Sequence, residues 1–286
     1  MPELLARALG RAERLPDGAP GERAQLLRHF ELLPRGWPVA ALTRQRDAGD
    51  AAGATWLRAD PAHVRPDING ARLLGIGEAL QPTRADVDAL LPALRPLFGD
   101  AGFALDAPTP SRWYLRLPRE ARLPAFAGPD DALGDDLFEH LPDGPEARRW
   151  RALLSEAQVV LHNHPRNAER AALGLPALNS LWFWGAGVFP DHVTSPHAHV
   201  RSHEVLLDAL ARAAGIADAV AEGAGSVLVD YRALASFEPG FLDWIAGAVA
   251  GKIPRLSLDF ADGARWELSG RQRWRFWRRP AQHLSA

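Results

Sequence analysis

The sequence contains no cysteine, and it is nearly without lysine and methionine. The absence of cysteine excludes disulfides, thiolate catalysis and metal or iron–sulfur sites with cysteine ligands. Of the 33 basic side chains only Lys252 is a lysine, so lysine offers one candidate for a nucleophile or a Schiff base. No apolar run approaches the roughly 20 residues of a membrane span. The charged, amphipathic start lacks the apolar core of a secretory signal, so we expect a cytoplasmic protein.

The overall charge is close to balanced. A net charge of −2 gives no general electrostatic reason to expect a nucleic acid or a membrane as partner. The length of 286 residues suffices for one large domain or two modest ones. Strand patterns alternate with helical patterns along the chain, which predicts an α/β fold with a mixed sheet and antiparallel hairpins near the C-terminus.

Several elements are predicted from local patterns. We expect helices over 83–98, with Thr83 as N-cap and a kink or a split at Pro92, and over 146–164. A further helix begins after Ser202 as its N-cap. Strands over 55–59 and 71–76 flank a polar loop with an Asn69-Gly70 turn, while 118–145 is predicted to be a loop. The alternation of residues 272–277 predicts a final strand with Gln272, Trp274 and Phe276 on its buried face.

The hexapeptide "HNHPRN" at 162–167 has two interpretations. Pro165 ends the preceding helix, and Asn167 then serves as the N-cap of a second helix. Alternatively, the free N–H groups of that second helix, together with His164, Arg166 and Arg170, form an anion site. Spacing alone does not separate the two.

The segment that begins at Leu154 and ends at Gly187 resembles part of the archaeal-type, cofactor-independent phosphoglycerate mutases. Its shared pattern is His-Pro-x-Asn, an arginine three residues on, Leu-Pro-x-x-Asn and a closing Gly-Ala-Gly. The matching positions are His164, Pro165, Asn167, Arg170, Leu175, Pro176, Asn179, Gly185 and Gly187. The chain resembles a second group more closely than it resembles these mutases. This is a proteobacterial phosphoglycerate mutase-like group identified with the E-type regulatory protein of the Rpf cluster. That similarity lies in "WLRADP", "RWYLRL", "NSLWFWGAG" and "RWRFWRRP".

The chain departs from the mutase pattern at both ends. These mutases belong to the alkaline phosphatase superfamily and need a hydroxyl nucleophile and two metal ions. The first 42 residues contain no Ser, Thr or Cys, and the last 80 contain only one histidine, His283. The resemblance therefore implies the inserted, substrate-facing part of the mutase without its metal-bearing half. It implies an N-terminal helical region over 1–52, a mutase-like α/β region over 53–215 and a C-terminal α/β region over 216–286 packed on it.

From the resemblance and the arginine spacing we predict a mutase-derived binding or regulatory module without catalytic residues, metal or cofactor. Its ligand is an anionic or phosphorylated small molecule, and any protein partner is unknown. The predicted ligand-binding residues are His164, Asn167, Arg170, Asn179, Arg58, Arg112 and Arg116. Two alternatives stay open: a phosphoglycerate mutase or related phosphatase with its metal on His197, His199 and His203, and a structural protein whose polar motifs are caps.

Three other patterns are weaker candidates. "RADPAHVRPD" gathers Arg58, Asp60, His63 and Arg65 around a predicted hairpin-like loop, as an anion site or as surface ion pairs. The Gly-Ala-Gly runs at 185–187 and 223–225 are predicted to be tight turns rather than phosphate loops. The arginines and aromatics of "RQRWRFWRRP" could contact nucleic acid, but the strand pattern favours a half-buried strand.

Overall fold

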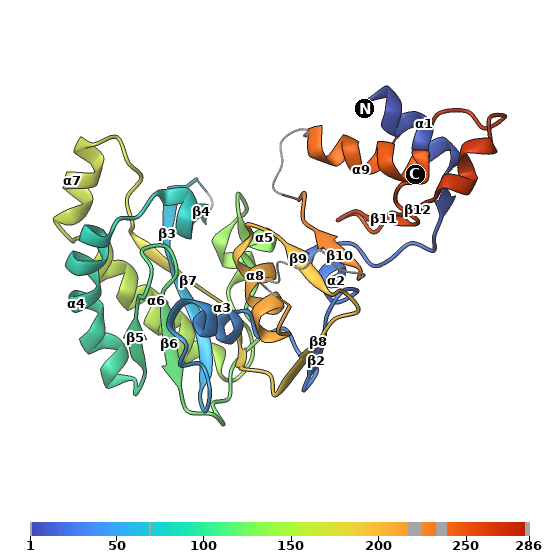
Figure 1. The fold of residues 1–286 in the computed structure, drawn as a ribbon. Coiled ribbons are helices and arrows are strands. Elements are labelled where there is room, and N and C mark those ends of the chain that lie inside the picture. The colour runs from blue at the N-terminus through green and yellow to red at the C-terminus, as the bar shows by residue number, and fades with distance from the viewer. Residues whose placement is uncertain (1, 69, 217–224, 233–238, 284–286) are drawn as a thin grey trace. The chain divides into compact units, whose positions relative to one another are not determined.

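The computed structural model describes residues 2–68, 70–216, 225–232 and 239–283 (Figure 1). The chain divides into two compact units, Leu32–His192 and the pair of segments Met1–Glu31 with Val193–Ala286. We call them the central unit and the terminal unit. The chain passes between them within β2 (Glu31–Leu33) and again within β8 (His192–Thr194). This division differs from the three consecutive regions expected from the sequence, because both chain ends belong to one unit.

A five-stranded antiparallel sheet organises the described part of the central unit. The long strand β3 pairs with β4, β6 and β7, and β5 extends the sheet beyond β6. The strands are β3 (Thr55–Asp67), β4 (Gly70–Ile76), β5 (Ala104–Asp106), β6 (Tyr114–Leu117) and β7 (Ser180–Val188). The helical elements are α3 (Val39–Ala48), η1 (Gly77–Leu80), α4 (Arg84–Asp100), α5 (Pro129–Ala132), η2 (Leu137–His140), α6 (Ala147–His162) and α7 (Arg166–Ala172).

The two faces of this sheet have different cores. Helices α4 and α6 pack against one face, where their leucines meet apolar side chains such as Leu57, Leu115 and Phe183. On the opposite face the alanines of α3 pack against Trp56 and Tyr114. Because side chains alternate along a strand, Arg58 shares the α3 side with Trp56. The fold is therefore a mixed α/β structure with antiparallel sheets, as the sequence predicted.

The terminal unit combines residues from both ends of the chain. One of its apolar clusters is formed by α1, α9 and the hairpin of β11 with β12. The elements are α1 (Glu3–Arg11), β1 (Glu13–Arg14), α2 (Glu22–Leu26), β9 (His199–Arg201), α8 (Val205–Ala213), β10 (Val227–Val229), α9 (Pro239–Ala250), β11 (Leu256–Asp259), β12 (Arg265–Leu268) and η3 (Gly270–Trp274). The predicted C-terminal hairpin is confirmed.

Helix α4 confirms the predicted cap, and it is not split at Pro92. Thr83 and Asp86 form a reciprocal capping box at its N-terminus. The helix continues through Pro92 and Pro96, both of which are exposed. Since these prolines lie four residues apart on the solvent side, water can replace the hydrogen bonds that they cannot make.

The polar stretch that begins at Asp60 was predicted to be a loop, and this prediction is wrong: β3 runs without interruption to Asp67. The strand tolerates these polar residues because they have partners, such as Ala177, whose carbonyl lies 2.9 Å from Nδ1 of His63. The predicted loop at 118–145 contains the short elements α5 and η2. Asn69 of the predicted turn lies outside the described residues.

Two further predictions of capping residues are wrong. Helix α7 begins at Arg166 with Pro165 at its N-cap position, so Asn167 does not cap it. Helix α8 is capped by Glu204, whose carboxylate accepts the N–H groups of the first turn, while the Ser202 hydroxyl donates to Asp230.

The predicted final strand over 272–277 is also wrong. Ser269 and Gln272 form a capping box at the N-terminus of the 3-10 helix η3, and Gln272 is buried. Trp274 and Phe276, which were expected to share its buried face, are exposed. The alternation of arginine and aromatic residues therefore follows a helical turn and a loop, not a sheet.

Candidate functional site

Arg58 and Asp60 form a buried ion pair on β3. Two parallel contacts join them, Nε to Oδ1 at 2.9 Å and Nη2 to Oδ2 at 2.8 Å, and their side chains are only 7% and 2% exposed. The carboxylate also accepts hydrogen bonds from the Trp113 backbone N–H and the Trp184 indole. A buried charge is tolerated when it is paired and hydrogen-bonded, and this pair meets both conditions.

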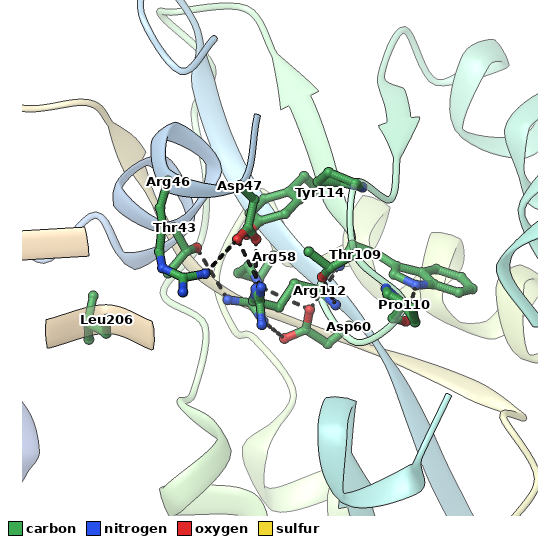
Figure 2. A network of polar contacts seen from close by, with 12 residues as sticks. Thr43, Arg46, Asp47, Arg58, Asp60, Thr109, Pro110, Arg112, Tyr114 and Leu206 are labelled. Atoms are coloured by element: carbon green, nitrogen blue, oxygen red, sulfur yellow. Dashed lines mark hydrogen bonds and ion pairs between the residues drawn. The ribbon is translucent and has the colours of Figure 1, made fainter. Parts of the chain in front are cut away.

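A second carboxylate, Asp47 on α3, neutralises Arg112. Nε and Nη2 of Arg112 lie 2.7 and 2.9 Å from its two oxygens, and the Tyr114 hydroxyl donates to it at 2.6 Å. Thr43, which is also on α3, contacts the first ion pair: its hydroxyl lies 3.3 Å from Nη1 of Arg58 (Figure 2). Burial alone would raise the pKa of Asp47, but the bonds from Arg112 and Tyr114 hold that pKa below its ordinary value.

The third carboxylate, Asp86, holds two arginines of α7. Nε of Arg166 and Nη1 of Arg170 each lie 2.7 Å from one of its oxygens. Arg170 is 1% exposed, and its remaining donors bond the carbonyls of Leu80 and Pro176. Burial would raise the pKa of Asp86, but its bonds from Thr83 and the two arginines lower it. The arginine of the mutase-like motif is thus fully occupied inside the protein.

The two motif asparagines fasten backbone segments together. The Asn167 amide donates to Leu161 and accepts the N–H of Leu178, at 2.8 Å in both cases. The Asn179 side chain accepts the N–H of Val64 and donates to its carbonyl, again at 2.8 Å. His164 is half-buried, and its Nδ1 accepts the N–H of Arg166 at 3.2 Å. "HNHPRN" therefore builds the junction of α6, α7 and the segment that leads into β7.

The predicted ligand-binding residues fall into separate groups. Arg58 and Arg112 belong to the network of Figure 2, and Asn167 and Arg170 lie around α7. Arg116 is exposed on β6, and among the described residues it makes no ion pair. Two open pockets of about 400 and about 320 Å³ contain none of the seven residues. They are lined chiefly by residues 137–158 in one case and 67–72 in the other.

The Gly-Ala-Gly run in β7 has a packing role. A Cβ at Gly185 would lie 2.9 Å from the Cβ of Val39, and one at Gly187 would lie 2.5 Å from that of Pro38. Gly185 also has a φ of +67°. These glycines let β7 approach the start of α3. The sequence predicted a tight turn here, but the glycines lie within a strand and serve its close packing. Of the second run, residues 223 and 224 lie outside the described residues.

The histidine-rich segment belongs to a polar chain in the terminal unit. Nε2 of His197 lies 3.0 Å from Nδ1 of His29, whose Nε2 lies 3.4 Å from Asp259. Nδ1 of His197 lies 2.9 Å from the hydroxyl of the exposed Ser226. When the Ser226 hydroxyl donates to Nδ1 of a neutral His197, Nε2–H of His197 donates to Nδ1 of His29. Nε2–H of His29 then points toward Asp259. This chain of contacts links a surface hydroxyl to a half-buried carboxylate through two imidazole rings and fixes their orientation.

Electrostatics favour that neutral state. Burial lowers the pKa of His197, and the neighbouring His29 lowers it further. Burial would raise the pKa of Asp259, but its bonds from Arg28 and His29 bring it down to about 2. Within the described ranges, no group of three or more His, Cys, Asp or Glu residues is arranged to hold a metal ion. His197, His199 and His203 accordingly do not form the metal set that the enzymatic alternative assigned to them.

Sequence reasoning missed the residues that define these clusters. Asp47 lies 65 positions from Arg112, and Asp259 lies 231 from Arg28, so no local pattern connects either pair. Asp86 follows the N-cap Thr83 by three positions, a local pattern that indicates a helix terminus and not a partner for two arginines 80 and 84 positions away. One sequence signal could have indicated such a cluster. Arg58 lies among the apolar residues of a predicted strand, and a buried arginine requires a carboxylate.

Comparison with known proteins agrees with the resemblance found in the sequence. No protein-family model matches the chain. A probable 2,3-bisphosphoglycerate-independent phosphoglycerate mutase from Geobacter sulfurreducens is 28% identical over 189 residues, which cover 64% of this chain and 46% of the relative. Another such mutase, from Methanothrix thermoacetophila, is 35% identical over 63 residues, covering 22% of this chain and 16% of that protein.

A solved structure is also similar, at a low level. The cofactor-independent phosphoglycerate mutase from Thermoplasma acidophilum superposes with a TM-score of 0.42 and 18% identity, covering 79% of this chain and 62% of that chain. The present chain thus spans about half the length of the first of these sequence relatives. Over that part, it is similar in sequence to 2,3-bisphosphoglycerate-independent phosphoglycerate mutases.

Proposed function

We propose that this protein is a mutase-derived binding or regulatory module in which the mutase-like motifs hold the fold together and conduct no phosphoryl transfer. The observation that carries the proposal is the internal use of the motif side chains. Arg58, Arg112 and Arg170 each face a carboxylate, and the two motif asparagines bond backbone groups. A phosphate group would have to displace those carboxylates in order to bind there.

The proposed ligand remains an anionic or phosphorylated small molecule. Of the seven predicted residues, the exposed Arg116 and the half-buried His164 are the ones that a solute can reach without breaking a buried ion pair. The guanidinium group supplies a permanent positive charge for such a ligand. These two residues lie in different groups, with Arg116 on β6 opposite Trp56 and His164 at the junction of α6 and α7, so each is a separate candidate contact for such a ligand.

We also propose a protein group and a cellular compartment for the chain. We assign the chain to the proteobacterial mutase-like group identified with the E-type regulatory protein of the Rpf cluster, and we place it in the cytoplasm. No helix in the described segments is both long and apolar enough to cross a membrane.

A turnover assay tests the loss of catalysis. The purified chain is incubated with 3-phosphoglycerate and Mn²⁺ or Mg²⁺, and the formation of 2-phosphoglycerate is followed through enolase. We expect no product above the rate without protein. Metal-dependent product formation would support the alternative, an active mutase or related phosphatase, and would refute the proposal.

A thermal-shift titration tests the ligand. With 3-phosphoglycerate or inorganic phosphate, we expect a rise in the melting temperature that either the Arg116→Gln or the His164→Gln variant abolishes. The matched control is Arg95→Gln, which changes another exposed arginine of the central unit. If no phosphorylated compound raises the melting temperature, the proposed small-molecule ligand is refuted. A regulatory role would then require a macromolecular partner.

A further inference from the structure

The segment 271–279 carries the most exposed tryptophans of the described chain, and we call it the cationic segment. Trp274, Phe276 and Trp277 are 66%, 75% and 69% exposed. No other tryptophan is among the exposed large apolar residues of the described ranges. Exposing three large aromatic side chains within four positions forgoes their burial, which marks an interaction surface rather than ordinary surface variation.

The same segment concentrates unpaired positive charge. Its arginines are Arg271, Arg273, Arg275, Arg278 and Arg279. In the described part of the chain, no carboxylate lies within ion-pair distance of their guanidinium groups. The sequence from Ser269 to the last residue contains no Asp or Glu. The overall net charge of −2 therefore conceals a local cluster of five positive charges.

The cationic segment is fixed on its own unit by hydrogen bonds to backbone carbonyls, not by its aromatic rings. Arg11 donates to the carbonyl of Arg273 at 3.3 Å, and Arg275 donates to that of Arg11 at 3.2 Å. Beyond the segment, Ala281 donates to the carbonyl of Ala6 at 2.8 Å. The aromatic side chains thus stay available to a partner while the backbone beneath them is held in place, which lowers the entropy cost of binding.

We propose that the cationic segment docks the protein on the surface of a lipid bilayer that contains anionic lipids. Tryptophan and phenylalanine are suited to the boundary between headgroups and acyl chains, and the arginines bind lipid phosphates. Anionic leaflets attract each arginine near their surface, over a distance set by the ionic strength. The net charge alone gave no reason to expect a membrane partner. The proposal rests instead on the local charge and the exposed aromatic side chains of this segment.

The ring geometry favours a bilayer over a single-stranded nucleic acid. Base stacking needs free ring faces. Here the guanidinium carbon of Arg273 lies 5.0 Å from the centroid of the Trp274 ring, and Phe276 meets Trp277 edge to face at 80°. These contacts cover one face of Trp274 and one face within the Phe276–Trp277 pair, which reduces the area open to stacking bases. Entry into a headgroup layer needs exposed apolar area but no free ring face.

Co-sedimentation with vesicles tests the proposal on the full chain. Vesicles of phosphatidylcholine with about one-third phosphatidylglycerol are compared with pure phosphatidylcholine, each at low and high salt. We expect binding to the anionic vesicles only, weakened by salt. Replacing all three aromatics by alanine should reduce the partition coefficient at least about tenfold. Changing Arg271, Arg278 and Arg279 to glutamine should reduce it on the order of a hundredfold.

Matched controls separate the segment from general surface effects. Phe138→Ala removes an aromatic side chain that is 61% exposed in an acidic neighbourhood of the central unit. The triple change of Arg95, Arg119 and Arg148 to glutamine removes the same charge from other exposed positions. Circular dichroism verifies that each variant is folded. Both controls should bind anionic vesicles like the unchanged protein.

Three outcomes overturn the proposal. The first is no binding to anionic vesicles, and the second is equal binding by the cationic-segment variants and the controls. The third is binding of a single-stranded oligonucleotide, lost in the same variants, without vesicle binding. The proposal rests on the terminal unit alone, so its failure would leave the proposed function of the central unit untouched.

Discussion

The arginines of the mutase-like motifs and those of the cationic segment differ in one respect, the presence of a carboxylate. Arg58, Arg112 and Arg170 lie against Asp60, Asp47 and Asp86, with side chains at most 14% exposed. The cationic segment has arginines beside aromatic rings as well, but its guanidinium groups face no carboxylate within the described ranges. An arginine next to an aromatic residue in the sequence is therefore not enough to indicate a binding site.

The difference follows from solvation. A buried guanidinium group needs a carboxylate, since the cost of removing it from water is several kcal/mol, and that carboxylate then occupies the site where an anion would bind. An exposed guanidinium group keeps its water and its charge, so it remains available to a partner. Replacing a motif arginine should consequently alter folding, while replacing one in the cationic segment should alter binding.

The largest expected effect is at Asp86. The Asp86→Ala variant leaves Arg166 and the fully buried Arg170 without their carboxylate. We expect the free energy of unfolding to fall by about 4 kcal/mol, measured by urea denaturation. Asp88→Ala, an exposed change on the same helix, is the control and should cost less than about 0.5 kcal/mol. Similar small losses in both variants would show that the buried pair is not structural.

Asp259 provides a smaller effect with a defined pH dependence. Its folded pKa of about 2 lies below the ordinary 3.8, so its contribution is complete above pH 3.8 and is lost as the pH falls through about 2. Asp259→Asn should lower the stability of the terminal unit by about 2 kcal/mol at neutral pH. It should also remove that part of the acid dependence. An unchanged acid profile in the variant would contradict the assignment.

His197 should give the weaker dependence near neutral pH. Its folded pKa is lowered below 6.5, so the unfolded chain binds the proton more readily between the two values. Stability contributed by neutral His197 is thus complete above pH 6.5 and decreases as the pH falls below it. Denaturation at several pH values should show this slope, and His197→Gln should flatten it. The exposed His162→Gln serves as control and should leave the slope unchanged.

Local patterns predicted elements whose determinants lie within a few residues. The Thr83 cap, the apolar stripe of α6 and the hairpin of β11 with β12 are of this kind. The pattern failed for β3 and for the segment 272–277. In both, polar residues were interpreted by their spacing, while their environment is set by distant groups such as Ala177 or by the capping side chain of Gln272.

The candidate site was predictable to a similar extent. The motif pattern identified His164, Asn167 and Arg170 as residues with a common purpose, and the structure shows them at one junction. Their roles depend on Asp86, which is 84 positions from Arg170, and on backbone groups of the following segment. A sequence pattern contains the residues of such a network but not the contacts that satisfy their charges.

The most direct test compares Arg170→Gln with the triple glutamine variant of Arg271, Arg278 and Arg279 in one urea denaturation series. We predict that Arg170→Gln lowers the free energy of unfolding by about 3 kcal/mol, because Asp86 loses a buried partner. The triple variant should stay within about 0.5 kcal/mol of the unchanged protein. Equal stability of all three proteins would contradict the account, since the motif arginine would then be free to bind a ligand.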